Sequence, residues 1–240
     1  MAYEAARTAG SGPGLERGLI CMLDPARNAP LVRHCARVVY RGYRDWRAGW
    51  TWHRAGRPLP PPPHIKRKFL RAYGRAQDLR IFVETGTFVG ETLTALRGSF
   101  EHLHSIELSR ELYESVLVRF SGDRKITLWH GDSGEVLPRL LAGLDKPALF
   151  WLDGHYSGGV TARGVEDTPI LRELEHIAKH RLGAQHHLIV DDVRLFTGAD
   201  GYPKLSDVER TAERLGFGFC RKHDDFLIIG PGTAMQAFPG

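Results

Sequence analysis

From Leu79 onward, the chain alternates short apolar runs with longer stretches in which apolar residues recur at helical spacing. Short apolar runs bounded by turn residues predict strands, which we expect at 80–84, 102–107, 125–131, 148–153 and 188–192. The intervening stretches predict helices at 92–97, 110–120, 134–144, 169–180 and 204–215. Two further runs, GFGFCRKH and DFLIIG, flank His223–Asp225 and predict a closing β-hairpin. Strands that alternate with helices indicate an α/β fold, with a parallel sheet covered by helices.

The front of the chain has a different pattern. Residues 1–18 are rich in Ala, Gly, Arg and Ser without periodicity and predict a flexible tail. Residues 30–52 predict an amphipathic helix with apolar positions at Leu31, Cys35, Val38, Val39, Tyr43 and Trp46. The proline run at 58–63 must be extended, and it separates this helix from another at 64–73. We therefore expect a tail at 1–18, a basic, aromatic helical extension with a proline-rich linker at 19–62, and one domain at 63–240.

The composition narrows the class of protein. With 240 residues, of which 42% are hydrophobic and 25% charged, the chain can form one substantial core and is neither disordered nor fibrous. Cys21, Cys35 and Cys220 lie far apart and form no CxxC pair, so we expect free thiols, a reducing compartment and no structural zinc. No apolar run approaches the roughly 18 residues that span a bilayer, and no signal pattern follows Met1. These features predict a cytoplasmic protein without a transmembrane segment.

Acidic residues stand where the predicted strands end. They are Glu84, Glu107, Asp132, Asp153, Asp191 and Asp192. Because the carboxyl ends of parallel strands lie along one edge of a sheet, we expect these side chains to line one crevice, where open α/β sheets bind ligands. Taken singly, each acid is explained more simply as the N-cap of the next helix.

The segment VETGTFVGET places Gly86 and Gly90 between a strand and a helix. Glycines there allow the backbone to approach a ligand, and the helix N-terminus offers free N–H groups. The segment is neither a GxGxxG fingerprint nor a P-loop, and tight packing is the alternative explanation. Glu107, about 20 residues further on, could accept both hydroxyls of a ribose, and Asp132 could accept an exocyclic amine of adenine.

In this order, ETGTFVG, SIELS, HGDSGEVLP, FWLDGHYSGG and IVDDVRLF resemble the motifs of class I S-adenosylmethionine-dependent methyltransferases, over about residues 63–230. The resemblance implies a Rossmann-like, doubly wound, seven-stranded, mostly parallel sheet whose last strand is antiparallel. It also implies that S-adenosylmethionine is the cofactor. The implied cofactor contacts are Glu84, Thr85, Gly86, Gly90, Glu107 and Asp153 near the methionine and ribose, and Asp132 and Ser133 near the adenine.

Asp153, Asp191 and Asp192 follow strands that are adjacent in this fold, so three carboxylates would converge beside the methyl group. Like charges held that close need neutralising, and a divalent cation with oxygen ligands, most simply Mg²⁺, would do this. The arrangement is similar to that of metal-dependent O-methyltransferases, including enzymes that act on sugars. Those families usually have a further acid two residues after the first, where this chain has His155.

His155 follows the fourth predicted strand directly and is our candidate general base, with Asp153 beside it, because an imidazole can remove a hydroxyl proton near neutral pH. The alternatives are a third metal ligand or an exposed loop histidine. The glycine-rich segment after it predicts a substrate loop whose acceptor contacts are Tyr156, Ser157 and Arg163.

Other polar and aromatic residues receive simpler interpretations. Glu173 and Glu175 are expected on a solvated helix face. Phe196 and Tyr202 would either form a wall of the site or pack in the core. Lys66, with its neighbours His64 and Lys68, precedes the first strand and could reach the carboxylate of the cofactor.

These observations favour methyl transfer to a hydroxyl of a small polar acceptor, such as a sugar. The alternatives are a non-catalytic cofactor-binding module that docks a partner or a membrane, and an RNA methyltransferase, against which the absence of an Asn-Pro-Pro-aromatic element argues. The net charge of the chain is +5, and its basic residues crowd between Arg27 and Arg80, where acids are almost absent. The basic helix could cover the cofactor cleft or form a homodimer, lie on an anionic membrane, or contact nucleic acid; we favour the first.

Overall fold

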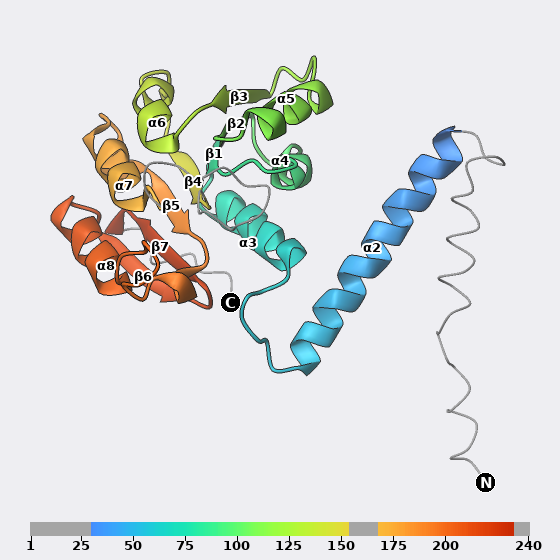
Figure 1. Cartoon of the computed structure of the whole chain (residues 1–240), viewed down its shortest axis with the longest axis horizontal. Coiled ribbons are helices and arrows are strands. Elements are labelled where there is room, and N and C mark those ends of the chain that lie inside the picture. Colours follow the sequence, from blue (N-terminus) through green and yellow to red (C-terminus); the bar gives the residue numbers. More distant parts are fainter. Residues whose placement is uncertain (1–29, 154–167, 233–240) are drawn as a thin grey trace, which may run out of the picture. The chain divides into compact units, whose positions relative to one another are not determined.

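A computed structural model of the chain describes residues 30–153 and 168–232. The chain divides into two compact units, Met1–Pro58 and Leu59–Gly240. The described part of the first unit is the helix α2 (Pro30–Arg54), drawn in blue in Figure 1, and the turn that follows it. Trp52 closes this turn, since its indole Nε1 donates a hydrogen bond to the carbonyl oxygen of Pro58 at 2.7 Å. No helix among the described residues is both long enough and apolar enough to cross a membrane.

The second unit contains a seven-stranded sheet with the order β3-β2-β1-β4-β5-β7-β6. The strands are β1 (Ile81–Thr85), β2 (His102–Glu107), β3 (Ile126–His130), β4 (Ala148–Leu152), β5 (His187–Val190), β6 (Phe219–His223) and β7 (Phe226–Gly230). Neighbouring strands from β3 to β5 pair in parallel, whereas β7 is antiparallel to both of its neighbours, β5 and β6. The predicted doubly wound sheet with an antiparallel last strand is therefore confirmed.

Helices cover both faces of the sheet (Figure 1). They are α3 (Pro63–Ala76), α4 (Glu91–Leu96), α5 (Arg110–Arg119), α6 (Ser133–Leu141), α7 (Ile170–Lys179) and α8 (Leu205–Arg214), with short 3-10 turns at Gly183–Gln185 and Val193–Leu195. One buried cluster joins α6, α7 and α8 to the sheet and the other joins α3, α4 and α5 to it. Successive strand residues point to opposite faces, so Val83 enters the first cluster and Phe82 the second. All residues of β1 and β4 are buried, as expected for central strands covered on both sides.

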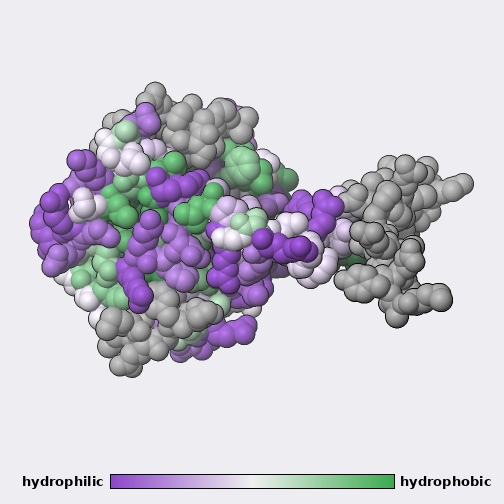
Figure 2. Space-filling model, turned by 90° about the horizontal axis from the view of Figure 1, so that it is seen from below, coloured by the Kyte–Doolittle hydropathy of each residue, from purple (hydrophilic) through white to green (hydrophobic). Residues whose placement is uncertain are grey.

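The predicted elements are present, with ends that differ by a few residues. The fourth strand ends at Leu152, so Asp153 is the first residue beyond it. Helix α3 begins at Pro63, which suits the first helical position because proline has a fixed φ and needs no N–H partner there. On the surface, hydrophobic side chains form small patches between hydrophilic ones (Figure 2). Leu117 and Val118 of α5 are among the exposed apolar residues.

Candidate active site

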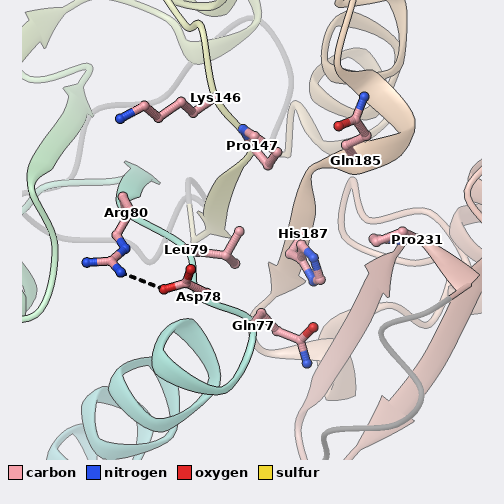
Figure 3. A pocket seen from close by; sticks show the side chains of 9 residues that line it. All are labelled: Gln77, Asp78, Leu79, Arg80, Lys146, Pro147, Gln185, His187 and Pro231. Atoms are coloured by element: carbon pink, nitrogen blue, oxygen red, sulfur yellow. Dashed lines mark hydrogen bonds and ion pairs between the residues drawn. The ribbon is translucent and has the colours of Figure 1, made fainter.

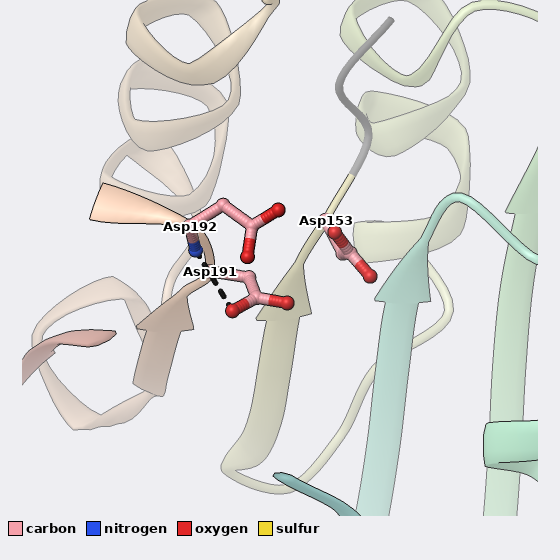
Figure 4. A group of neighbouring side chains, drawn as sticks. All are labelled: Asp153, Asp191 and Asp192. Carbon is pink, nitrogen blue, oxygen red and sulfur yellow. Dashed lines mark hydrogen bonds between the residues drawn. The ribbon is translucent and has the colours of Figure 1, made fainter. Parts of the chain in front are cut away.

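Three aspartates meet at the carboxyl edge of the sheet. Asp153 follows β4, and Asp191 and Asp192 follow β5, which pairs with β4 in parallel. Each offers an oxygen, and these oxygens lie within 4.8 Å of one another (Figure 4). Asp192 has a left-handed backbone conformation, and its N–H donates to Asp191 Oδ1 at 2.8 Å. The turn after β5 thus holds two adjacent carboxylates toward the third.

Two cations from other elements pair with these aspartates. Lys66 of α3 donates from Nζ to Asp191 Oδ2 at 2.6 Å and to Asp192 Oδ1 at 2.7 Å. Arg194 donates to the same Oδ1 of Asp192 at 2.8 Å and also pairs with the buried Asp225 of the β6–β7 turn. The turn at Asp191 and Asp192, which we call the aspartate turn, is therefore held by two cations. From the sequence we expected that Lys66 could reach the carboxylate of the cofactor. In the structure its partners are Asp191 and Asp192.

The three carboxyl groups differ in acidity because their surroundings differ. Burial raises the pKa of Asp191 to about 7, against the attraction of Lys66. Burial and the charge of Asp191 also raise the pKa of Asp153 well above its usual range. Burial acts on Asp192 in the same direction, but the hydrogen bonds from Arg194 and Lys66 outweigh it and lower its pKa to about 2. Asp192 is thus the member that stays ionised most readily.

The donor chemistry of the cluster fits a hard divalent cation. Carboxylate oxygens are the ligands that Mg²⁺ and Ca²⁺ prefer, and three of them converge here. Lys66 occupies two of the same oxygens, so the chain already supplies one positive charge at this point. A metal ion would have to displace the ammonium group or use the remaining oxygens.

The loop between β1 and α4, residues 86–90, which we call the glycine loop, is held to the end of β2 by hydrogen bonds. The carboxylate of Glu107 accepts the backbone N–H of Phe88 on Oε2 at 2.8 Å and that of Ser109 on Oε1 at 2.9 Å. Gly90 has a φ of +71°, and a Cβ there would stand 2.7 Å from the ring of Phe120. Tight packing therefore explains Gly90. Each oxygen of Glu107 keeps a further lone pair, so its contacts to the loop leave it able to accept a hydroxyl.

Glu84 of β1 is buried and also helps to hold the glycine loop. Ser105 donates its hydroxyl to Glu84 Oε1 at 2.7 Å, and the hydroxyls of Ser105 and Thr87 lie 2.5 Å apart. Burial raises the pKa of Glu84 to about 8, against the hydrogen bond from Ser105. Glu84 therefore carries a proton near neutral pH. Through Ser105 and Thr87, its hydrogen bond connects β1, β2 and the loop.

Asp132 has the structural role that the N-cap explanation anticipated. Its Oδ1 accepts the N–H of Gly134 at 2.9 Å at the start of α6, and Arg172 of α7 lies 3.2 Å from the same oxygen. Ser133, the first residue of α6, is buried beside it.

The prediction that Glu173 lies on a solvated helix face is wrong. Its side chain is buried beneath α7, near Thr85 of β1 and Ser133 of α6, and burial raises its pKa to about 7 against the hydroxyls of these two residues. The sequence does contain a signal for this burial, because Glu173 falls at i+3 from Ile170 and shares the apolar stripe of α7. Glu175, two residues on, has a side chain that is 43% exposed and pairs with Lys179.

Two of the predictions concern core residues, and four others cannot be placed. Phe196 packs in the core with its ring edge-on to Tyr202, so of the two interpretations packing is correct. His155, Tyr156, Ser157 and Arg163 lie outside the described residues.

A hollow of about 510 Å³ lies at the opposite, amino-terminal end of the strands (Figure 3). It is lined by residues that precede or begin β1, β4 and β5, among them Arg80, Lys146 and His187, and by Pro231 after β7. Arg80 is already paired with Asp78 at 2.8 Å. Of the predicted site residues that the structure describes, none lines this hollow.

No protein-family model and no curated protein matches the sequence. Solved structures do match the fold. An O-methyltransferase from Bacillus cereus in complex with S-adenosylhomocysteine aligns with a TM-score of 0.51 at 14% identity, covering 76% of this chain and 87% of that one. The O-methyltransferase TomG from Streptomyces achromogenes, in complex with S-adenosylmethionine, aligns with a TM-score of 0.49 at 18% identity, covering 76% and 86%. With its strand order and antiparallel β7, the chain has the fold of the class I S-adenosylmethionine-dependent methyltransferases.

Proposed function

We propose that this protein transfers the methyl group of S-adenosylmethionine to a hydroxyl of a small polar acceptor, such as a saccharide. The observation that carries the proposal is the meeting of two features at one edge of a methyltransferase fold. The glycine loop fastened by Glu107 lies after β1, and the cluster of Asp153, Asp191 and Asp192 follows the adjacent strands β4 and β5. The first suits a nucleoside cofactor and the second suits a polar acceptor.

The cofactor would bind along the ends of β1, β2 and β3. Glu107 has lone pairs left for ribose hydroxyls, and the backbone at Gly86 lets the methionine part approach β1. Asp132 and Ser133 would lie beside the adenine, with Glu84, Thr85 and Asp153 completing the site. When bound, S-adenosylmethionine supplies an electrophilic methyl group on a sulfonium.

The residues of the chain have three tasks in such a reaction. They align the acceptor oxygen in line with the methyl group and its sulfur, they exclude water, and they take the proton of the hydroxyl. We assign the proton to His155 and the acceptor contacts to Tyr156, Ser157 and Arg163. Asp153, Asp191 and Asp192 would hold a Mg²⁺ ion, which would lower the pKa of the acceptor hydroxyl and orient it.

Calorimetric titration with S-adenosylhomocysteine, with Mg²⁺ or with EDTA, tests the proposal. We expect micromolar affinity for the wild type and weaker binding for Glu107→Gln. Glu114→Gln is the matched control, because Glu114 is an exposed acid of α5 whose partner is Arg110 of the same helix. Failure of the wild type to bind S-adenosylhomocysteine under either condition would overturn the proposal.

A further inference from the structure

One face of α2 presents apolar and aromatic side chains to its surroundings. Val39, Tyr43, Trp46 and Trp50 are spaced i, i+4, i+7 and i+11, which places them on one stripe of the helix. Val39 is 60% exposed, Trp46 64% and Trp50 50%. Tryptophans are rarely left so open, since each brings a large apolar surface that water solvates poorly. Binding of a partner to this face would remove its apolar surface from water.

The first unit packs its third tryptophan differently. Trp52 is only 7% exposed, with its indole N–H bonded to Pro58 and Arg57 over its ring. The ring of Trp46 is tilted against that of Tyr43 of the same stripe, with 6.3 Å between their centroids, and Arg54 lies 4.7 Å over the ring of Trp50. Trp52 thus stabilises the end of the helix, whereas Trp46 and Trp50 contribute to no buried core.

The charge of the helix restricts what the partner can be. Its 25 residues include six arginines and one acid, Asp45, which leaves a net charge of +5 with histidines neutral. Two copies of the helix in contact would bring these charges together, which opposes self-association. An anionic surface is electrostatically complementary to the helix instead.

We propose that α2 binds the surface of an anionic lipid bilayer and lies in the plane of its interface. A basic polar face, low mean hydropathy and an apolar face that carries tryptophans are the features of interfacial helices, and indole rings favour the headgroup region. The arginines would attract the anionic headgroups while Val39, Trp46 and Trp50 insert between the lipids. Nucleic acid would satisfy the arginines but would leave the apolar stripe in water. The proposal does not depend on the methyltransferase reaction.

Co-sedimentation of the full chain with lipid vesicles tests this inference. We expect binding to vesicles of phosphatidylglycerol and phosphatidylcholine in equal amounts, little binding to phosphatidylcholine alone, and loss of binding at high salt. The double variant Trp46→Ser/Trp50→Ser should bind at least about tenfold more weakly, since it removes most of the inserted apolar surface. Arg44→Gln/Arg47→Gln should weaken binding and reduce its dependence on salt.

The matched control is Leu117→Ser/Val118→Ser, which removes exposed apolar side chains from α5 instead. Its binding should equal that of the wild type, and binding of S-adenosylhomocysteine reports separately on the second unit. Three outcomes would overturn the proposal: no binding of the wild type to anionic vesicles at low salt, equal binding by the tryptophan variant, or a stable dimer that the tryptophan variant dissociates. Tight binding of RNA without binding of vesicles would equally reject it.

Discussion

Replacing Glu173 by glutamine should remove part of the pH dependence of the stability of the fold. Burial raises the pKa of this carboxyl group from 4.5 to about 7, and the charge of Asp132 acts in the same direction. Between these values the folded state keeps a proton that the unfolded state has lost. The free energy of unfolding therefore falls as the pH rises from 4.5 to about 7 and levels off above that range.

The size of the effect follows from the shift. One pKa unit corresponds to about 1.4 kcal/mol, so this group lowers the stability by about 3 kcal/mol at alkaline pH relative to acidic pH. Glutamine has nearly the same shape and no charge to lose. Glu173→Gln should match the wild type within about 1 kcal/mol near pH 5 and exceed it by up to about 3 kcal/mol near pH 8.5.

Denaturant unfolding of both proteins at the two pH values measures the difference. Glu175→Gln serves as the control, since this neighbouring acid of α7 has a side chain that is 43% exposed. Its stability relative to the wild type should not change with pH by more than a few tenths of a kcal/mol, as for exposed charges in general. A constant difference between Glu173→Gln and the wild type at both pH values would refute the reasoning, because it would mean that Glu173 is ionised throughout.

Other variants test the remaining parts of the site. Lys66→Met frees two aspartate oxygens from their ammonium partner, so calorimetry should show Mg²⁺ binding at least about tenfold more tightly than in the wild type, and unchanged affinity would contradict the competition between them. His155→Ala should lower turnover far more than affinity for the cofactor, and Glu107→Ala should do the reverse; equal effects on both quantities would undo the two assignments. Gly90→Ala should cost about 1–3 kcal/mol in denaturant unfolding because of its positive φ and the ring 2.7 Å from the added Cβ, whereas Gly98→Ala, with open space around it, should cost less than 1 kcal/mol or stabilise α4's end; equal costs would count against the packing argument.

The alternation of apolar runs and helical stretches was sufficient to predict the sheet. Strand β4 is a continuous apolar segment and β1 begins with three apolar residues, because both faces of these strands are covered. The convergence of Asp153 with Asp191 follows from the pairing of parallel neighbours, which the resemblance implied. Periodicity and strand order together thus predicted that these aspartates meet at one edge of the sheet.

Contacts between distant segments leave no such pattern. Lys66 is 125 positions from Asp191, and nothing in either segment shows that α3 reaches the turn after β5. The bonds from Glu107 to the loop involve backbone N–H groups, which every residue carries. Glu173 differs, since its place in the apolar stripe of α7 predicts burial even though charged residues mostly lie at the surface.

The position of β7 between β5 and β6 affects how the protein folds during its synthesis. A ribosome releases β5 well before β7, so during synthesis β5 stays an unpaired sheet edge that can attract other chains. Asp225, in the turn just ahead of β7, is also the partner that holds Arg194 against the aspartate turn. Until this hairpin docks, Arg194 lacks the carboxylate of Asp225 that holds it beside Asp192, so the sheet and this support of the acidic cluster are completed in the same late step.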